Sequence, residues 1–151
     1  RVFEQRLSRF LWMSLASSLA FNVLMATWFY PQILIYQSSS VVGKWIREQG
    51  MNQETLFVTK VNARSLDVYT HSTALEISTN QIDSILLEKP QFLIFTNEDG
   101  LAEIKEAKLN YSLVRQLEDY PVALLSMNFG NPNKRKEVLR KTYLLRVKKT
   151  D

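Results

Sequence analysis

The feature that most constrains this chain is a run of 34 residues without a charged side chain, between Arg9 and Lys44. Residues 10–30 of that run, FLWMSLASSLAFNVLMATWFY, are mostly apolar on every side of a helix. A helix of this length measures about 31 Å, which is close to the thickness of a membrane's hydrocarbon core. The rest of the chain is too short to bury such a helix on all sides. The sequence therefore predicts one transmembrane helix over residues 10–30.

Both ends of this helix carry signals of a membrane boundary. The aromatic residues 28–30 match the belt that lies at membrane interfaces. Pro31 cannot continue the hydrogen-bond ladder, so we expect the helix to end at Tyr30. Three arginines (Arg1, Arg6 and Arg9) precede it, and this bias predicts a cytoplasmic N-terminus with everything after Pro31 outside. Because the chain begins at Arg1 and not at Met, we expect it to be a fragment or a processed piece.

Two other interpretations of residues 10–30 stay open. One is a cleaved signal peptide with a small-x-small site at residues 18–20, although cleavage there would leave an apolar stretch on the mature chain. The other is the buried core helix of a soluble protein. Four polar residues recur at helical spacing, which favours a face that packs against other membrane helices. These are Ser14, Ser17, Ser18 and Asn22.

Residues 31–106 alternate between helical and strand-like patterns. The alternation predicts a parallel sheet with helices on its faces. Ser38 to Ser40 offer N-caps for the first helix, Gly50 ends it, and Asn97 caps the last one. The expected helices lie at 41–49, 63–70 and 82–89, with a fourth after Asn97 whose buried side is Leu101 and Ile104. The expected strands lie at 55–61, 74–77 and 91–96. The strand that contains FLIF is apolar throughout, as a strand covered on both faces should be.

The last third of the chain has a different pattern. Residues 111–129 read mostly as strand, with a bend at 119–121. A short helix follows in 131–141, with Asn131 as N-cap and Pro132 in its first turn. Residues 143–148 alternate, which predicts a strand with one wet face. The sequence thus predicts the α/β class: a transmembrane helix with a cytoplasmic basic flank in residues 1–30, then a small three-layer extracytoplasmic α/β domain in residues 31–151 with a mixed, mainly parallel sheet.

The residues that usually carry catalysis are scarce. The chain has four glycines, no glycine-rich phosphate loop and no cysteine, and His71 is its single histidine. Carboxylate pairs occur at 98–99 and 118–119 beside turn residues, where a solvated turn is the simpler interpretation. We therefore predict no catalytic residue, no metal site and no cofactor. The lack of cysteine also fits an oxidising compartment.

Charge is the more informative property. Residues 134–149 hold eight basic residues and one acid, whereas residues 31–133 hold eight basic and twelve acidic residues. On a membrane-tethered domain this basic stripe predicts contact with anionic lipid headgroups, and a solvated helix face is the alternative. Nucleic acid is disfavoured because the stripe offers only Tyr143 for stacking. The candidate contact residues are Tyr36, Gln37, Lys44, Lys134, Arg135, Lys136, Arg140 and Lys141.

Several stretches together resemble a known group of enzymes. FYPQILIYQSSSVVGKWI, SLDVYT, FLIFTNEDGLAEI and LEDYPVALLSMNFGNPNKRKEVLRKTYLLRV are similar to the C-terminal part of bacterial membrane glycosyltransferases of the protein-O-mannosyltransferase type. The group includes the aminoarabinose transferase that modifies lipid A. The resemblance covers nearly the whole chain. Its main carriers are Tyr30, Pro31, Tyr36, Gln37 and residues 129–147.

The resemblance implies a last transmembrane helix that leads into a periplasmic α/β domain at the inner membrane. Enzymes of this group move a sugar from a polyprenyl-phosphate carrier to a lipid or protein acceptor. Their catalytic acidic residues lie in early periplasmic loops, which no segment here matches, so no catalytic residue is carried over. The implied partners are membrane lipid, the rest of the transferase's transmembrane domain and the polyprenyl-phosphate sugar donor.

Three functions are therefore considered. The first is an accessory C-terminal domain of such a transferase, which is not catalytic alone. The second is a single-pass, membrane-anchored envelope protein whose α/β domain is a binding module. The third is a soluble enzyme with a buried apolar helix. The residues themselves do not identify the sugar, the acceptor or the oligomeric state.

Overall fold

The computed structural model describes residues 2–50, 56–70, 74–121 and 126–149. The chain divides into two compact units, residues 1–35 and residues 36–151. Three sequence predictions fall wholly or partly outside the described residues: a surface or loop position for His71, the start of the strand expected at 55–61, and the part of the 111–129 strand at 122–125.

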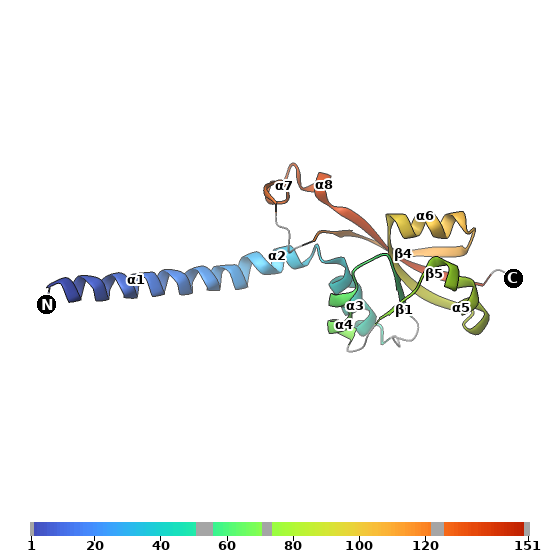
Figure 1. The fold of residues 1–151 in the computed structure, drawn as a ribbon, viewed down its shortest axis with the longest axis horizontal. Helices are drawn as coiled ribbons and strands as arrows, with labels where there is room; N and C mark the ends of the chain where they lie inside the picture. Colours follow the sequence, from blue (N-terminus) through green and yellow to red (C-terminus); the bar gives the residue numbers. More distant parts are fainter. Residues whose placement is uncertain (1, 51–55, 71–73, 122–125, 150–151) are drawn as a thin grey trace. The chain divides into compact units, whose positions relative to one another are not determined.

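The first unit is a continuous helical run (Figure 1). It comprises α1 (Val2–Leu24), a π-helical turn (Met25–Phe29) and α2 (Tyr30–Leu34). Most of its large apolar side chains are exposed, among them Phe10, Trp12 and Trp28, whereas Ile33 is buried. Within the described residues, Arg6–Leu34 is the one helix long and apolar enough to cross a membrane, with a mean hydropathy of 1.5 and none of its most apolar window buried. The apolar N-terminal helix expected from the sequence is confirmed.

The expectation that this helix ends at Tyr30 is wrong. A proline inside an α-helix loses one backbone hydrogen bond, and its ring collides with the carbonyl four residues earlier, here that of Thr27. The turn before Pro31 is π-helical, and the N–H of Tyr30 donates to the carbonyl of Met25, five residues back. This wider turn places Pro31 in the first turn of α2, where a missing N–H is tolerated. The helix therefore continues to Leu34.

The second unit is a three-layer α/β domain built on a five-stranded sheet (Figure 1). Its strands are β1 (Leu56–Thr59), β2 (Leu75–Glu76), β3 (Gln91–Asn97), β4 (Asn110–Asp119) and β5 (Arg140–Lys148). The order is β2-β1-β3-β5-β4. β2, β1 and β3 are parallel, whereas β5 is antiparallel to both β3 and β4. The mixed sheet predicted from the sequence is confirmed.

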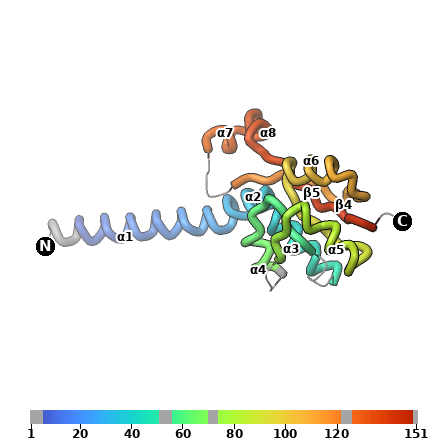
Figure 2. The backbone as a smooth tube through the Cα atoms, turned by 45° about the vertical axis from the view of Figure 1, so that its right-hand side comes forward, coloured from blue at the N-terminus to red at the C-terminus, as the bar shows by residue number. Residues whose placement is uncertain are grey.

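Helices cover both faces of this sheet. On one face α3 (Ser38–Glu48) and α4 (Arg64–Thr70) pack side by side, as Figures 1 and 2 both show. On the other face lie α5 (Ile82–Glu88) and α6 (Glu98–Glu106). Two short helices, α7 (Met127–Gly130) and α8 (Arg135–Val138), precede β5. α3 ends as predicted, because Gly50 adopts a φ of 63°, which glycine tolerates at a helix end.

The predicted interior strand is confirmed in β3. Leu93 and Phe95 pack with α3 and α4, and Phe92 and Ile94 pack with α5 and α6. All four side chains are at most 2% exposed. Alternate residues of a strand point to opposite faces, so only a strand with a helical layer on each side can bury every one of them.

The prediction that β5 has one wet face is wrong. Leu144, placed on the supposed wet face, is fully buried against α3 and α4, while Leu145 and Val147 are buried on the opposite face. Both faces of the strand are buried because of the place of β5 in the sheet. β5 is inserted between β3 and β4, so both of its faces are covered along most of its length.

The segment before β5 also differs from the prediction. Residues 127–130 form α7 and no strand, and the hydroxyl of Ser126 caps this helix by accepting from the N–H of Phe129 at 3.3 Å. Asn131 is not the N-cap of the next helix, which begins only at Arg135. Its side chain accepts instead from the N–H of Asn133 at 3.1 Å. Asparagine side chains commonly close such a turn, which delays the helix by one turn.

Candidate functional site

An aromatic cluster joins the start of the second unit to its closing segment. Tyr120 stacks on Phe129 with ring centroids 4.0 Å apart, and Tyr36 meets Phe129 edge-on at 5.3 Å. The guanidinium of Arg135 lies 5.5 Å from the Tyr36 ring and 5.1 Å from the Phe129 ring. It donates to the carbonyl of Phe129 at 2.9 Å and to the Tyr36 hydroxyl at 3.2 Å. Arg135 thus has a structural role within this cluster.

The N-terminus of α3 is held by the end of β4. The backbone N–H and the hydroxyl of Ser38 both donate to Oδ1 of Asp119, at 3.1 and 2.5 Å. The serines predicted as N-caps instead lie inside α3 and are buried. The carboxylate of Asp119, at the end of β4, takes the capping role, because the first N–H groups of a helix need acceptors and favour negative charge. This contact fixes where α3 meets the sheet.

A polar crevice of about 450 Å³ opens at this end of the sheet. β1, β3 and β4 all end at this edge, because β3 and β4 are both antiparallel to β5, which begins here. The described residues that line the crevice come from these strand ends, from the loops beside them, from the start of β5 and from the starts of α3 and α4. They are Gln37, Ser39, Lys60, Val61, Asn62, Arg64, Ser65, Asn97, Asp119, Tyr120, Pro121, Arg140, Lys141 and Thr142.

The strand order explains why a crevice forms here. From β1 the chain passes through α4 to β2, which neighbours β1 in the sheet. It then returns through α5 to β3, which is the other neighbour of β1. The connections after β1 and β3 therefore diverge onto opposite faces of the sheet. Ligands of open α/β sheets bind at such a switch point, outside the carboxyl ends of the strands.

Local hydrogen bonds shape the walls of the crevice. The side chain of Asn62 accepts from the N–H of Arg64 at 3.2 Å, which folds the loop between β1 and α4. The hydroxyls of Ser39 and Ser65 bond to each other and so join α3 to α4. Thr142 is 2% exposed, and its hydroxyl is a buried group without a hydrogen-bond partner among the described residues.

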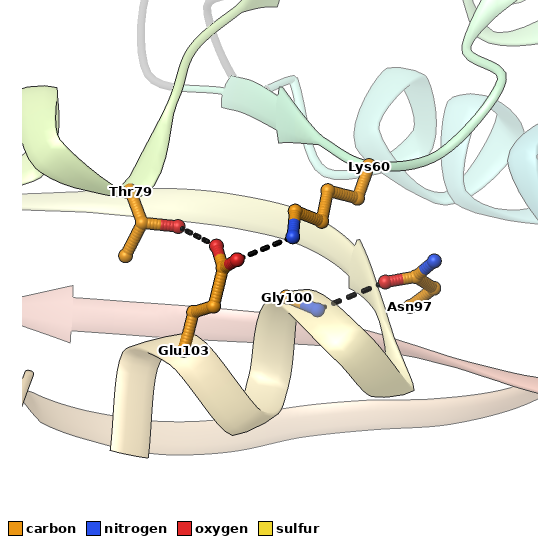
Figure 3. Close-up of polar contacts among 5 residues, drawn as sticks. All are labelled: Lys60, Thr79, Asn97, Gly100 and Glu103. Atoms are coloured by element: carbon orange, nitrogen blue, oxygen red, sulfur yellow. Dashed lines mark hydrogen bonds and ion pairs between the residues drawn. The ribbon is translucent and has the colours of Figure 1, made fainter. Parts of the chain in front are cut away.

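Lys60 separates this crevice from a wider and more acidic one. It follows β1 with a φ of 55°, unusual for a residue other than glycine. As Figure 3 shows, its ammonium pairs with Glu103 on α6, and the Thr79 hydroxyl donates to the other carboxylate oxygen at 2.6 Å. These bonds lower the pKa of Glu103 and raise the pKa of Lys60. The three residues, with Glu76 and Glu106, line a depression of about 770 Å³.

The cap of α6 completes this region. The side chain of Asn97 accepts from the N–H of Gly100 at 2.9 Å, as predicted for an N-cap (Figure 3). The closely packed first turn of α6 therefore begins directly beside the end of β3. Among the residues that the structure describes, no group of three or more His, Cys, Asp or Glu side chains could hold a metal ion.

The structure gives the eight predicted contact residues different surroundings. Tyr36 and Arg135 meet in the aromatic cluster, whereas Gln37, Arg140 and Lys141 line the crevice. The ammonium of Lys44 lies 5.1 Å from the Tyr69 ring on α4. Lys134, the N-cap residue of α8, and Lys136, within α8, are exposed. Their contact with lipid headgroups stays a prediction.

Sequence reasoning missed Lys60, Asn62, Arg64 and Thr142. A usable signal was present, because the loop after the first strand of an α/β domain is a common ligand-binding position. Thr142 carried no such signal, since its place depends on the pairing of β5 with β3.

Comparison with family models, with curated proteins and with solved structures finds no match to this chain.

Proposed function

We propose that this chain is a membrane-tethered accessory domain of a membrane glycosyltransferase that moves a sugar from a polyprenyl-phosphate carrier to a lipid or protein acceptor. In this proposal the α/β domain lies outside the inner membrane, in the periplasm or the extracellular space. The apolar helix packs against the rest of the transferase's transmembrane domain, and the catalytic groups are supplied from there.

The observation that carries the proposal is the contact between Tyr36 and Arg135 in the aromatic cluster. The two stretches that most resemble the transferases, the Tyr-Pro to Tyr-Gln junction and the closing segment, are far apart in sequence. Their meeting at one cluster supports the idea that the resemblance reflects a shared structural unit. The exposed apolar helix ahead of this unit is a second support.

The first experiment tests the orientation. Because the chain has no cysteine, single substitutions Ser8→Cys and Ser84→Cys give two unique labels, one before the apolar stretch and one on α5. In intact cells a membrane-impermeant maleimide should label Ser84→Cys alone, and Ser8→Cys should react only after permeabilisation. The reverse pattern, or labelling of neither site before permeabilisation, would contradict an extracytoplasmic domain.

The second experiment tests the transferase. The gene that contains this sequence, with its neighbours, is expressed with and without residues 36–151, and membranes are assayed for sugar transfer from a polyprenyl-phosphate donor. Transfer should be lost or strongly reduced, while immunoblots show the membrane part still present. A gene with no further apolar span, or transfer that is unchanged without the domain, would count against the proposal.

A single-pass envelope protein with a binding domain is the second candidate. The crevice at the strand ends favours it, because binding at that position needs no other chain. It predicts that the chain extracted in mild detergent migrates without a multi-spanning partner. The transferase proposal predicts instead that such spans co-purify or belong to the same polypeptide.

A further inference from the structure

Unpaired cations gather in the crevice from separate parts of the chain. Arg64 begins α4, and Arg140 and Lys141 begin β5. Among the described residues none of the three forms an ion pair. Lys60 also lines the crevice, but its charge is matched by Glu103 outside it. These three unpaired cations therefore line a space that has little negative charge of its own.

Among the described residues that line the crevice, Asp119 is the one carboxylate, and it is engaged with α3. Its Oδ1 accepts two hydrogen bonds from Ser38. It stands opposite Arg140 in the pairing of β4 with β5, yet no ion pair joins the two side chains. The crevice thus keeps a positive charge in a concave site, where a low-dielectric wall strengthens the attraction for an anion.

Thr142 is an independent indication of a polar ligand. Its hydroxyl is buried and lacks a hydrogen-bond partner in the described structure, although the residue lines the crevice. Buried polar groups in folded proteins are normally hydrogen-bonded, so an orphaned one calls for a partner from outside. A hydroxyl can donate to an anionic oxygen, and it then adds to the charge-assisted bonds of neighbouring arginines.

We propose that this crevice binds a phosphate group, as a soluble phosphate ester or as a phospholipid headgroup. Arginine guanidinium groups match phosphate oxygens through two parallel bonds, and the site offers two arginines and a lysine. Its volume of about 450 Å³ leaves room for a polar substituent beside Asn62 and Gln37. The net positive charge disfavours a metal cation. The proposal stands on the crevice itself and does not depend on the proposed function.

The test uses the full chain in nanodiscs of neutral lipid. Inorganic phosphate and glycerol phosphate are titrated at constant ionic strength, with chloride as the reference anion, and binding is followed by calorimetry. The parent chain should bind phosphate saturably. The triple variant Arg64→Gln, Arg140→Gln and Lys141→Gln should bind more than about tenfold more weakly, because it loses every unpaired cation of the site.

A matched variant separates site binding from general charge. Lys105→Gln, Lys134→Gln and Lys136→Gln remove the same charge from exposed positions outside the crevice, and this protein should bind phosphate as the parent does. Equal weakening in both triple variants, or no saturable binding by the parent, would overturn the proposal. Thr142→Val should also weaken binding without lowering the melting temperature, whereas unchanged affinity would remove the hydroxyl from the site.

A second arm of the experiment identifies the source of the phosphate group. The nanodiscs are prepared with and without phosphatidic acid, and the crevice variant is compared with the matched variant in each. Headgroup binding predicts that the anionic lipid competes with free phosphate in the parent and the matched variant. A soluble ester predicts that the phosphate affinity stays the same in both lipids. Either result supports the site, provided that the crevice variant loses the binding.

Discussion

Gly100, at the start of α6, gives the sharpest test of how this helix packs on the sheet. A Cβ atom at this position would lie 2.0 Å from the hydroxyl oxygen of Thr96, 3.3 Å from its Cβ and 3.4 Å from the Cγ2 of Thr59. Thr96 is fully buried and Thr59 is 2% exposed, so neither can move out into solvent. The substitution Gly100→Ala therefore forces atoms into occupied space.

The size of the effect follows from two opposing contributions. Overpacking a dense core costs about 1–3 kcal/mol. Replacing a helical glycine with alanine returns about 0.5–1 kcal/mol through helix propensity. Because the new Cβ lies only 2.0 Å from the Thr96 oxygen, the overpacking cost falls in the upper part of its range, and the free energy of unfolding should fall by about 1–2 kcal/mol. For a domain of this size that lowers the melting temperature by roughly 3–10 °C.

The assay is thermal unfolding of the full chain in detergent, followed by near-ultraviolet circular dichroism. The control is the same substitution in a Thr96→Ala background, where the hydroxyl oxygen that lies 2.0 Å from the new Cβ is gone and only the longer contacts with the Cβ of residue 96 and the Cγ2 of Thr59, at 3.3 and 3.4 Å, are left. There Gly100→Ala should be neutral or stabilising, so the sign of its effect changes between the two backgrounds. If Gly100→Ala alone melts at or above the parent temperature, the close packing of α6 on β3 is wrong.

Three further outcomes are expected. Ile94→Asp places an unpaired charge between β3 and its covering helices and should lower the free energy of unfolding by several kcal/mol, enough to unfold the domain. A melting temperature within a degree or two of that of the parent would contradict the central position of β3. Glu103 has a lowered pKa and Lys60 a raised one, so their ion pair should contribute to stability between the two ordinary pKa values. This contribution should fade as pH falls through the lowered pKa of Glu103 and as pH rises through the raised pKa of Lys60. In a pH series, the stability of Glu103→Gln should differ slightly from that of the parent near neutrality and converge with it in acid, and a difference that widened in acid would refute this sign. Arg135→Gln should lower the free energy of unfolding by about 1–3 kcal/mol, because the arginine's bonds in the aromatic cluster are lost. Lys136→Gln, at an exposed position, should change it by less than about 0.5 kcal/mol. Equal effects of the two substitutions in chemical denaturation would show that Arg135 has no structural role.

The parts of the fold that were predictable have local causes. Gly50 ends α3 and Asn97 caps α6, because each supplies chemistry that a helix end requires. The FLIF strand is apolar on both faces, which fixes its interior place. The end of the first helix was missed for a local reason too, since a π-helical turn before Pro31 leaves no mark in the residue pattern.

The site was less predictable because it depends on pairings between distant residues. The basic composition of residues 134–149 drew attention to Arg140 and Lys141, which do line the crevice. The same composition suggested one continuous stripe, yet Arg135 is engaged in the aromatic cluster. Arg64 joins the crevice only because β1 ends at the same edge of the sheet as β3 ends and β5 begins, and that depends on the order of strands, which no local pattern carries.

The place of β5 has a consequence for how the chain is made. β5, the last described strand of the domain, is inserted between two strands that are synthesised before it, β3 and β4. Until it arrives, β4 has no neighbour in the sheet, and one side of β3 exposes its backbone groups. Native pairing of this kind joins residues far apart in sequence and is slow to form. The domain therefore cannot complete its core before β5 has been synthesised, and its unpaired strands are open to wrong partners until then.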